Sequence, residues 1–167
     1  DMSISELNTM SSDAARAQFR QCCTSDEWVE RMLSSMPYGD AAELMVAADR
    51  HWENMDEADY LQAFDGHPKI GNVSSLKEKY ASTKSLASGE QSSVDSASDD
   101  VINRLALGNK DYEEKYGFIF IVCASGKSAE EMLGLLESRL SNDRATELAN
   151  AREEQRKIFQ IRIEKIL

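Results

Sequence analysis

The chain has 167 residues, 41% hydrophobic and 29% charged, the balance of a globular domain with enough apolar side chains for a core. Its 30 acidic and 19 basic side chains give a formal net charge of -11 at pH 7. Such a charge repels nucleic acid and anionic membrane surfaces, and no basic cluster offsets it, so we expect neither as a partner. The longest apolar run, residues 118–124, is too short to cross a bilayer.

The first elements are predicted to be helices. Eight glycines and two prolines leave long stretches of the chain without a helix breaker. Serine or aspartate precedes several amphipathic segments, as is typical of helix N-caps. These caps, with apolar spacings of three and four residues, predict helices over about 12–21, 26–33, 41–52 and 56–64.

The next segment, residues 74–98, is rich in serine and poor in apolar side chains, and we expect a surface loop over part of it. Near its end, Glu90 follows a glycine as at the start of a helix, where a carboxylate favours the positive end of the helix dipole. That helix is predicted to run to Tyr116 and to end at Gly117.

The apolar run at residues 118–124 then predicts an extended segment or a buried connector. A turn at 125–128 leads into an amphipathic helix, and a last helix is predicted from about Asn142 to the C-terminus. No internal repeat or linker is visible. The chain is therefore predicted to be one all-α domain over residues 1–167, a compact bundle of about eight helices with one short extended segment.

One turn, Gly66-His67-Pro68-Lys69-Ile70-Gly71-Asn72-Val73, contains one of the two histidines. A residue before proline is pushed out of the helical region, so His67 is predicted at a helix end with its ring projecting from the turn. Pro68 fixes its own backbone, and Gly71 permits a second bend. The turn either punctuates a helix or presents an imidazole for proton transfer, and taken alone it favours punctuation.

Arg162 lies in line with Ile158 and Ile166 on the predicted last helix, which places a guanidinium on an apolar stripe. The guanidinium cannot lose its charge there and requires an anion. Three interpretations are open: a salt bridge within the chain, a side chain that reaches solvent at the helix edge, or a bidentate grip on a carboxylate-bearing ligand.

Other reactive side chains are ambiguous. Glu90 can stabilise a helix N-terminus or, near an imidazole, fix the tautomer of the ring. Cys123 lies in the apolar run and is more typical of a core residue than of a nucleophile. His51 is interpreted as a surface or interface residue. Since no cysteine or carboxylate stands at ligand spacing from either histidine, no metal site is predicted.

The three cysteines are odd in number, and Cys22 and Cys23 are adjacent, which predicts free thiols in a reducing compartment. The first residues lack the basic and apolar regions of a secretory signal. The last three, Lys165 to Leu167, do not form a peroxisomal tripeptide. No targeting segment is therefore visible in these residues.

Together these residues resemble the family of 2-oxo-4-hydroxy-4-carboxy-5-ureidoimidazoline (OHCU) decarboxylases, which act in urate degradation. Four motifs in order carry the resemblance: residues 67–72, 90–92, 112–124 and 162–163. Cys22-Cys23 and residues 118–126 are especially similar to the plant-type proteins, in which this domain is fused to a transthyretin-like hydrolase domain.

The resemblance implies an all-α, cofactor-free and usually dimeric enzyme that converts OHCU to S-allantoin and carbon dioxide. It assigns catalysis to His67, Glu90 and Arg162. It assigns substrate contacts to Pro68, Ala87, Gln91 and the backbone of Phe120, Ile121, Val122, Cys123 and Ala124. Family members commonly carry serine at the position of Ala87, and Ser85 or Ser88 could substitute for it.

Partners and location also follow from the resemblance alone. It implies OHCU as the small-molecule substrate, a homodimer, and a fused or separate transthyretin-like 5-hydroxyisourate hydrolase. It implies the peroxisome, with the cytoplasm as the alternative because no signal is visible. Two other hypotheses stay open: a helical interaction module in which His67 and Arg162 are structural, and a thiol enzyme centred on Cys123.

Overall fold

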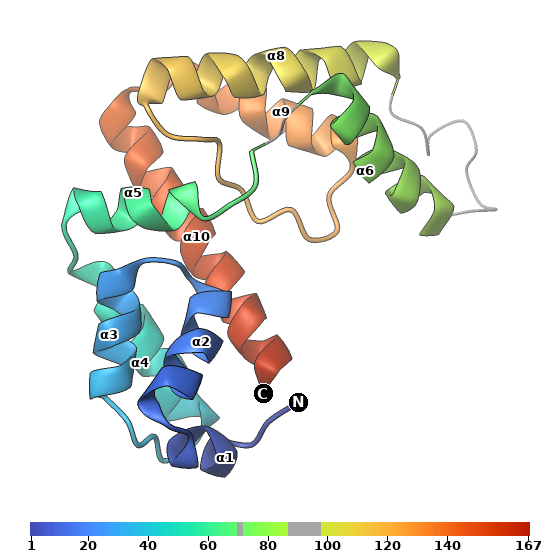
Figure 1. Ribbon diagram of the computed structural model, residues 1–167. Coiled ribbons are helices and arrows are strands. Elements are labelled where there is room, and N and C mark those ends of the chain that lie inside the picture. The colour runs from blue at the N-terminus through green and yellow to red at the C-terminus, as the bar shows by residue number, and fades with distance from the viewer. Residues whose placement is uncertain (70–71, 87–97) are drawn as a thin grey trace. The chain divides into compact units, whose positions relative to one another are not determined.

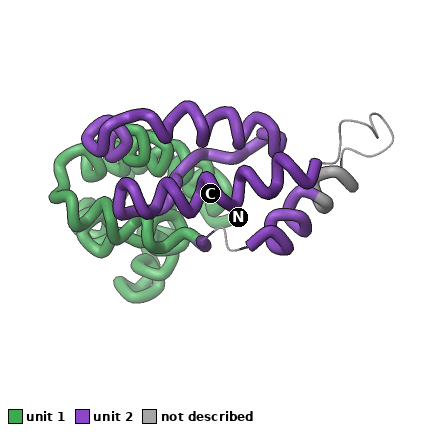
Figure 2. Tube along the Cα trace, turned by 90° about the horizontal axis from the view of Figure 1, so that it is seen from above, with its two compact units in different colours: residues 1–67, 150–167 green, residues 68–149 purple. Residues whose placement is uncertain are grey.

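The computed structural model describes residues 1–69, 72–86 and 98–167, and these form two compact units (Figures 1 and 2). One unit contains residues 1–67 and 150–167, and the other contains residues 68–149, green and purple in Figure 2. No strand occurs in the described residues, which confirms the all-α class, while the single domain over 1–167 stays a prediction. Their nine helices are α1 (Ile4–Thr9), α2 (Ser12–Cys22), α3 (Asp26–Ser34), α4 (Ala41–Glu53), α5 (Glu57–Asp65), α6 (Val73–Leu86), α8 (Asp99–Tyr116), α9 (Ala129–Arg139) and α10 (Arg144–Ile166).

Capping residues set most helix starts where the sequence predicts them. The hydroxyl oxygens of Ser11 and Ser25 accept hydrogen bonds from the first turns of α2 and α3, and a carboxylate oxygen of Asp40 does so for α4. Asp56 forms a capping box at the start of α5. Gly117 ends α8 with a positive φ of 83°, a left-handed conformation that glycine adopts without strain.

One helix start was predicted wrongly, and two helices were not foreseen. The short helix α1 lies in a stretch for which no element was predicted. Part of the serine-rich segment is the helix α6, because Leu76 and Tyr80, four residues apart, give the helix a buried side. The surface loop expected over part of that segment stays a prediction, since residues 87–97 lie outside the described residues. The next helix begins at Asp99 with Ser98 as its N-cap, not near Glu90, which lies outside the described residues.

The first unit is built around aromatic side chains from α3, α4 and α10. The Phe159 ring lies 5.1 Å from the Trp28 ring and 5.7 Å from the Trp52 ring, between centroids. Both indole N–H groups are satisfied, donating over 3.0 Å to the carbonyl oxygens of Ala48 and Arg152. Burial of three large rings provides much of the hydrophobic stabilisation of this unit.

Within this unit α10 buries a row of side chains four residues apart: Ala151, Gln155, Phe159 and Ile163. The row that holds Arg162, with Ile158 and Ile166, is only half-buried. The apolar stripe predicted around Arg162 therefore lies at the boundary between the buried and the exposed face of α10. The row that faces the core is a different one, and it contains Gln155.

In the second unit α8 and α9 lie side by side, and α6 packs on α8 (Figure 1). The predicted apolar run at 118–124 is a buried connector without strand pairing, with the side chains of Phe118, Phe120 and Ile121 in the core. The rings of Tyr112 and Phe120 lie 5.3 Å apart, so this connector packs directly on α8. In the described parts of the chain, no helix is both long and apolar enough to cross a membrane.

The capping box at the start of α9 gives a test of this arrangement. The Ser128 hydroxyl accepts from the Glu131 N–H over 3.1 Å, and the Glu131 carboxylate accepts from the Ser128 N–H over 3.3 Å. We expect Ser128→Ala to lower the free energy of unfolding by about 1 kcal/mol, because an N–H at the helix start loses its acceptor. Urea unfolding measures the change. The exposed Ser125→Ala is the control, and equal stability of the two variants would contradict the capping role.

Candidate functional site

The turn that presents His67 is fixed by a close contact of Gly66. Helix α5 ends at Asp65, Gly66 is its C-cap, and the His67 N–H donates to the Phe64 carbonyl over 3.2 Å. A Cβ placed on Gly66 would overlap the side chain of Thr24, whose hydroxyl donates to the Ala63 carbonyl over 3.4 Å. The glycine is thus required by space, and the helix end predicted before His67 is confirmed. The ring itself is half-buried instead of projecting freely from the turn.

The His67 ring meets a buried amide. Its Nε2 lies 2.5 Å from Oε1 of Gln155, a residue of α10 that is only 1% exposed. Burial lowers the pKa of His67 below its ordinary value, and the positive charge of Arg162 lowers it further, although the bond to Gln155 acts in the opposite direction. The ring is therefore neutral at neutral pH.

Arg162 is half-buried and has no carboxylate partner in the described residues. Its Nη1 donates to the Cys22 carbonyl over 3.4 Å, and this is its hydrogen bond in that part of the chain. On the same helix, by contrast, Arg156 bonds the carboxylates of Glu153 and Asp49. Of the three interpretations, the salt bridge within the chain is therefore not seen among the described residues. A guanidinium beside a neutral imidazole can bind an anion.

The thiols near Arg162 are unreactive. Burial raises the pKa of Cys22 to about 11 and that of Cys23 to about 12, and the Arg162 charge offsets this only in part. Cys22, Cys23 and Cys123 are all buried, and none of them forms a disulfide within the described residues. A protonated, buried thiol is a poor nucleophile, so the imidazole and the guanidinium are the stronger candidates for chemistry in the first unit.

In the second unit Pro68 and Phe120 line one cavity of about 500 Å³, together with Lys69, Asn72 and Ile119. Ala124 lines a different one, of about 320 Å³, beside Tyr80 and Lys127. Among the predicted backbone contacts, three carbonyl oxygens already accept internal hydrogen bonds. The Ile121 carbonyl accepts from Arg139 and the Cys123 carbonyl from the Lys127 side chain, each over 2.8 Å, and the Ala124 carbonyl accepts from the Lys127 N–H over 3.1 Å.

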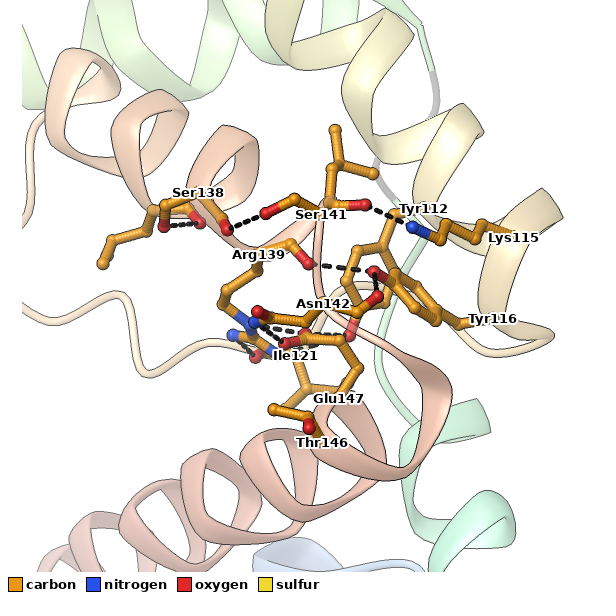
Figure 3. A network of polar contacts seen from close by, with 12 residues as sticks. Tyr112, Lys115, Tyr116, Ile121, Ser138, Arg139, Ser141, Asn142, Thr146 and Glu147 are labelled. Carbon is orange, nitrogen blue, oxygen red and sulfur yellow. Dashed lines mark hydrogen bonds and ion pairs between the residues drawn. The ribbon is translucent and has the colours of Figure 1, made fainter.

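A network of buried polar contacts anchors the connector at Ile121 (Figure 3). The guanidinium of Arg139 donates to the Ile121 carbonyl and also, through its Nε, to Oε1 of Glu147 over 2.7 Å. Glu147 is fully buried. The Tyr112 hydroxyl donates to the same carboxylate oxygen over 2.6 Å. The guanidinium also lies 4.6 Å from the centre of the Phe120 ring. Every member has a partner, so the network fixes the path of the connector.

The remaining predicted residues divide in two groups. Ala87, Glu90 and Gln91 lie outside the described residues, as do Ile70 and Gly71 of the turn. His51 is half-buried, and its Nε2 lies 2.7 Å from the Ser35 hydroxyl. Among the described residues no cluster of His, Cys, Asp or Glu could hold a metal ion.

Gln155 and Arg139 were missed by the sequence analysis. For Gln155 a signal exists: the residues four before and after it, Ala151 and Phe159, are apolar, so a polar residue stands on the buried row of α10. For Arg139 there is none, because an arginine in the last turn of a helix is ordinarily an exposed residue that favours the helix dipole.

The chain is similar to known proteins over most of its length. It matches the family model described as OHCU decarboxylase over residues 8–164. It is 32% identical over 157 residues to the uric acid degradation bifunctional protein TTL of Arabidopsis thaliana, covering 94% of this chain and 48% of that protein. It is 26% identical over 164 residues to the 2-oxo-4-hydroxy-4-carboxy-5-ureidoimidazoline decarboxylase of Haloferax volcanii, covering 98% and 95%.

A solved structure is similar as well. A crystal structure of OHCU decarboxylase in the presence of (S)-allantoin superposes with a TM-score of 0.72 at 33% identity, covering 89% of this chain and 96% of that chain. The chain thus spans about half the length of the Arabidopsis relative (48%) and nearly all of the crystallised one.

The Arg139–Glu147 pair predicts a large effect on stability. We expect Glu147→Ala to lower the free energy of unfolding by about 3–5 kcal/mol, because it leaves the buried Arg139 charge without its counter-ion. Guanidinium unfolding measures the loss. The control is Glu137→Ala, which breaks the exposed pair with Arg104 and should change stability little. Similar losses in both variants would contradict the role of the buried network.

The lowered pKa of His67 predicts a pH dependence of stability. Because the unfolded chain binds the proton more readily, the native state loses stability as pH falls from about 6.5, the ordinary pKa of histidine, through the lower folded value. We expect His67→Asn to lose less stability than the wild type over that interval, as measured by melting temperature against pH. Parallel curves for the two proteins would show that folding does not shift the pKa of His67.

Proposed function

Because the chain belongs to the OHCU decarboxylase family, we propose that it converts OHCU to S-allantoin and carbon dioxide in urate degradation. The proposal is supported by the family match and by the similar structure crystallised with (S)-allantoin. The observation that carries it is Arg162, a half-buried cation with no carboxylate partner in the described residues, whose charge acts on a neutral His67.

In this reaction the heterocycle must accept the electron pair of the broken carbon–carbon bond and then take up one proton. The bond between the ring carbon and the carboxylate breaks, its electron pair passes into the adjoining imine or carbonyl of the heterocycle, and carbon dioxide leaves. A proton then adds to the ring from one face, which gives a single enantiomer. The protein should hold the carboxylate perpendicular to the ring and control that face.

We assign roles on this basis. Arg162 anchors anionic or carbonyl oxygens of the substrate through its guanidinium. His67 positions the carboxylate group and assists proton delivery, and Glu90 is proposed to act beside the imidazole. Pro68, Ala87, Gln91 and the backbone of residues 120–124 keep their proposed contacts with the ring and ureido groups.

Assembly and location are proposals that rest on the family resemblance. We propose a homodimer, a transthyretin-like 5-hydroxyisourate hydrolase as fused or separate partner, and a peroxisomal location. The name of the Arabidopsis relative, a bifunctional protein, supports a second activity in that relative. Light scattering of the purified chain tests the dimer.

A coupled assay tests the activity. OHCU is generated from urate in situ, the protein is added, and optical activity is followed, because only the catalysed route gives one enantiomer of allantoin. We expect His67→Asn to lower the rate by about 100-fold or more, the range of general acid–base contributions. The matched control is His51→Asn, which removes the other histidine and should keep the wild-type rate.

Two outcomes would contradict the proposal. Racemic product at the uncatalysed rate with wild-type protein would rule out the decarboxylase and favour an interaction module. Full activity of His67→Asn would remove the role given to that residue. Cys123→Ala is expected to remain active, and its inactivity would favour the thiol enzyme.

A further inference from the structure

Within the first unit, the buried row of α10 contains one polar side chain. Gln155 is 1% exposed and stands between Ala151 and Phe159, both fully buried. An amide in such a place costs stability unless it is hydrogen-bonded. In the described residues its hydrogen bond is the one to Nε2 of His67. The buried amide is therefore hydrogen-bonded to the imidazole and not to a group of its own helix.

We propose that Gln155 is a positioning residue that fixes His67 in one tautomer, with the proton on Nε2 and the lone pair on Nδ1. With Oε1 of Gln155 facing Nε2, two lone pairs at that distance would repel, so this orientation of the amide requires the hydrogen on Nε2. The opposite orientation, with the amide NH2 facing the ring, would place the hydrogen on Nδ1, and the tautomer measurement separates the two. The inference rests on the proposed function of His67, because positioning matters only if the ring contacts substrate.

The surroundings of the ring support a neutral imidazole. In the described part of the chain Arg162 of α10 is the charged group that acts on His67, and a cation opposes protonation of the ring. The close approach of Gly66 to Thr24 restricts the backbone of the residue before His67. The backbone and one ring nitrogen are thus fixed, which leaves the lone pair of Nδ1 to face a ligand. Through this acceptor His67 would bind an N–H or O–H group of the substrate, which positions the carboxylate indirectly, and would assist proton delivery by way of a bound water.

The tautomer can be measured without substrate. In His51→Asn the chain keeps one histidine, so long-range ¹H–¹⁵N spectra of the ¹⁵N-labelled protein at pH 7.5 report His67 alone. We expect a protonated Nε2 and an unprotonated Nδ1. A proton on Nδ1, or fast exchange between the two tautomers, would overturn the proposal.

Substitution of Gln155 adds a kinetic test. Gln155→Leu removes the acceptor while keeping a side chain of similar size, and we expect mixed tautomers and about tenfold lower kcat with little change in KM, the size of one lost hydrogen bond. The matched control is Gln160→Leu on the same helix, since Gln160 bonds Asp49 and not His67. Wild-type spectra and kcat in Gln155→Leu would overturn the role.

Gln155→Glu separates positioning from mere packing. A carboxylate at this position still accepts from Nε2–H but stabilises the imidazolium, so the pKa of His67 should rise and the acid limb of kcat/KM should move to higher pH. An unmoved acid limb would contradict the contact. Failure of the decarboxylase proposal is recognised separately, since the wild type would then lack activity while the spectra still show the Nε2–H tautomer.

Discussion

Burial of polar groups constrains this protein more than any single apolar contact does. Four polar or charged residues are buried in the described chain: Ser25, Arg139, Glu147 and Gln155. No buried side-chain nitrogen or oxygen there is left without a hydrogen bond. Ser25 caps a helix, Arg139 and Glu147 pair with each other, and Gln155 meets His67. Since an unsatisfied polar group in a core costs more than the bond itself contributes, each of these side chains dictates where its partner lies. The core thereby fixes both the imidazole in one unit and the apolar connector in the other.

Arg162 differs from these residues because its charge is not neutralised by a carboxylate among the described residues. A half-buried cation is tolerated when its stem packs on apolar surface and its head reaches solvent or an anion. The neighbouring His67 cannot serve as that anion, and the neutral thiols of Cys22 and Cys23 cannot either. Arg162 thus contributes a positive charge near an uncharged imidazole, a combination suited to the proposed substrate, which would arrive as a carboxylate and leave without it. Fixed charges of this kind need no rearrangement when the substrate binds.

Much of the fold could be predicted because helix ends depend on local chemistry. Ser11, Ser25, Asp40 and Gly117 act through bonds to residues a few positions away, so the sequence displays them directly. Helix α6 was missed because its stability comes from packing against α8, which local composition does not reveal. The bond between His67 and Gln155 spans 88 positions, and no local pattern encodes which partner a buried amide will find. The predicted roles of Glu90, Gln91 and Ala87 lie outside the described residues.

The contact between Gly66 and Thr24 has a consequence for how the sequence can change. Because any side chain at position 66 would occupy the space of Thr24, the residues allowed at the two positions depend on each other. A side chain at position 66 is tolerated only if the residue at position 24 has first been replaced by a smaller one. If position 66 changes first, the turn is displaced. The two positions should therefore covary among related sequences although 42 residues separate them. Such order dependence links the immediate neighbour of His67 to a residue that no substrate needs to touch.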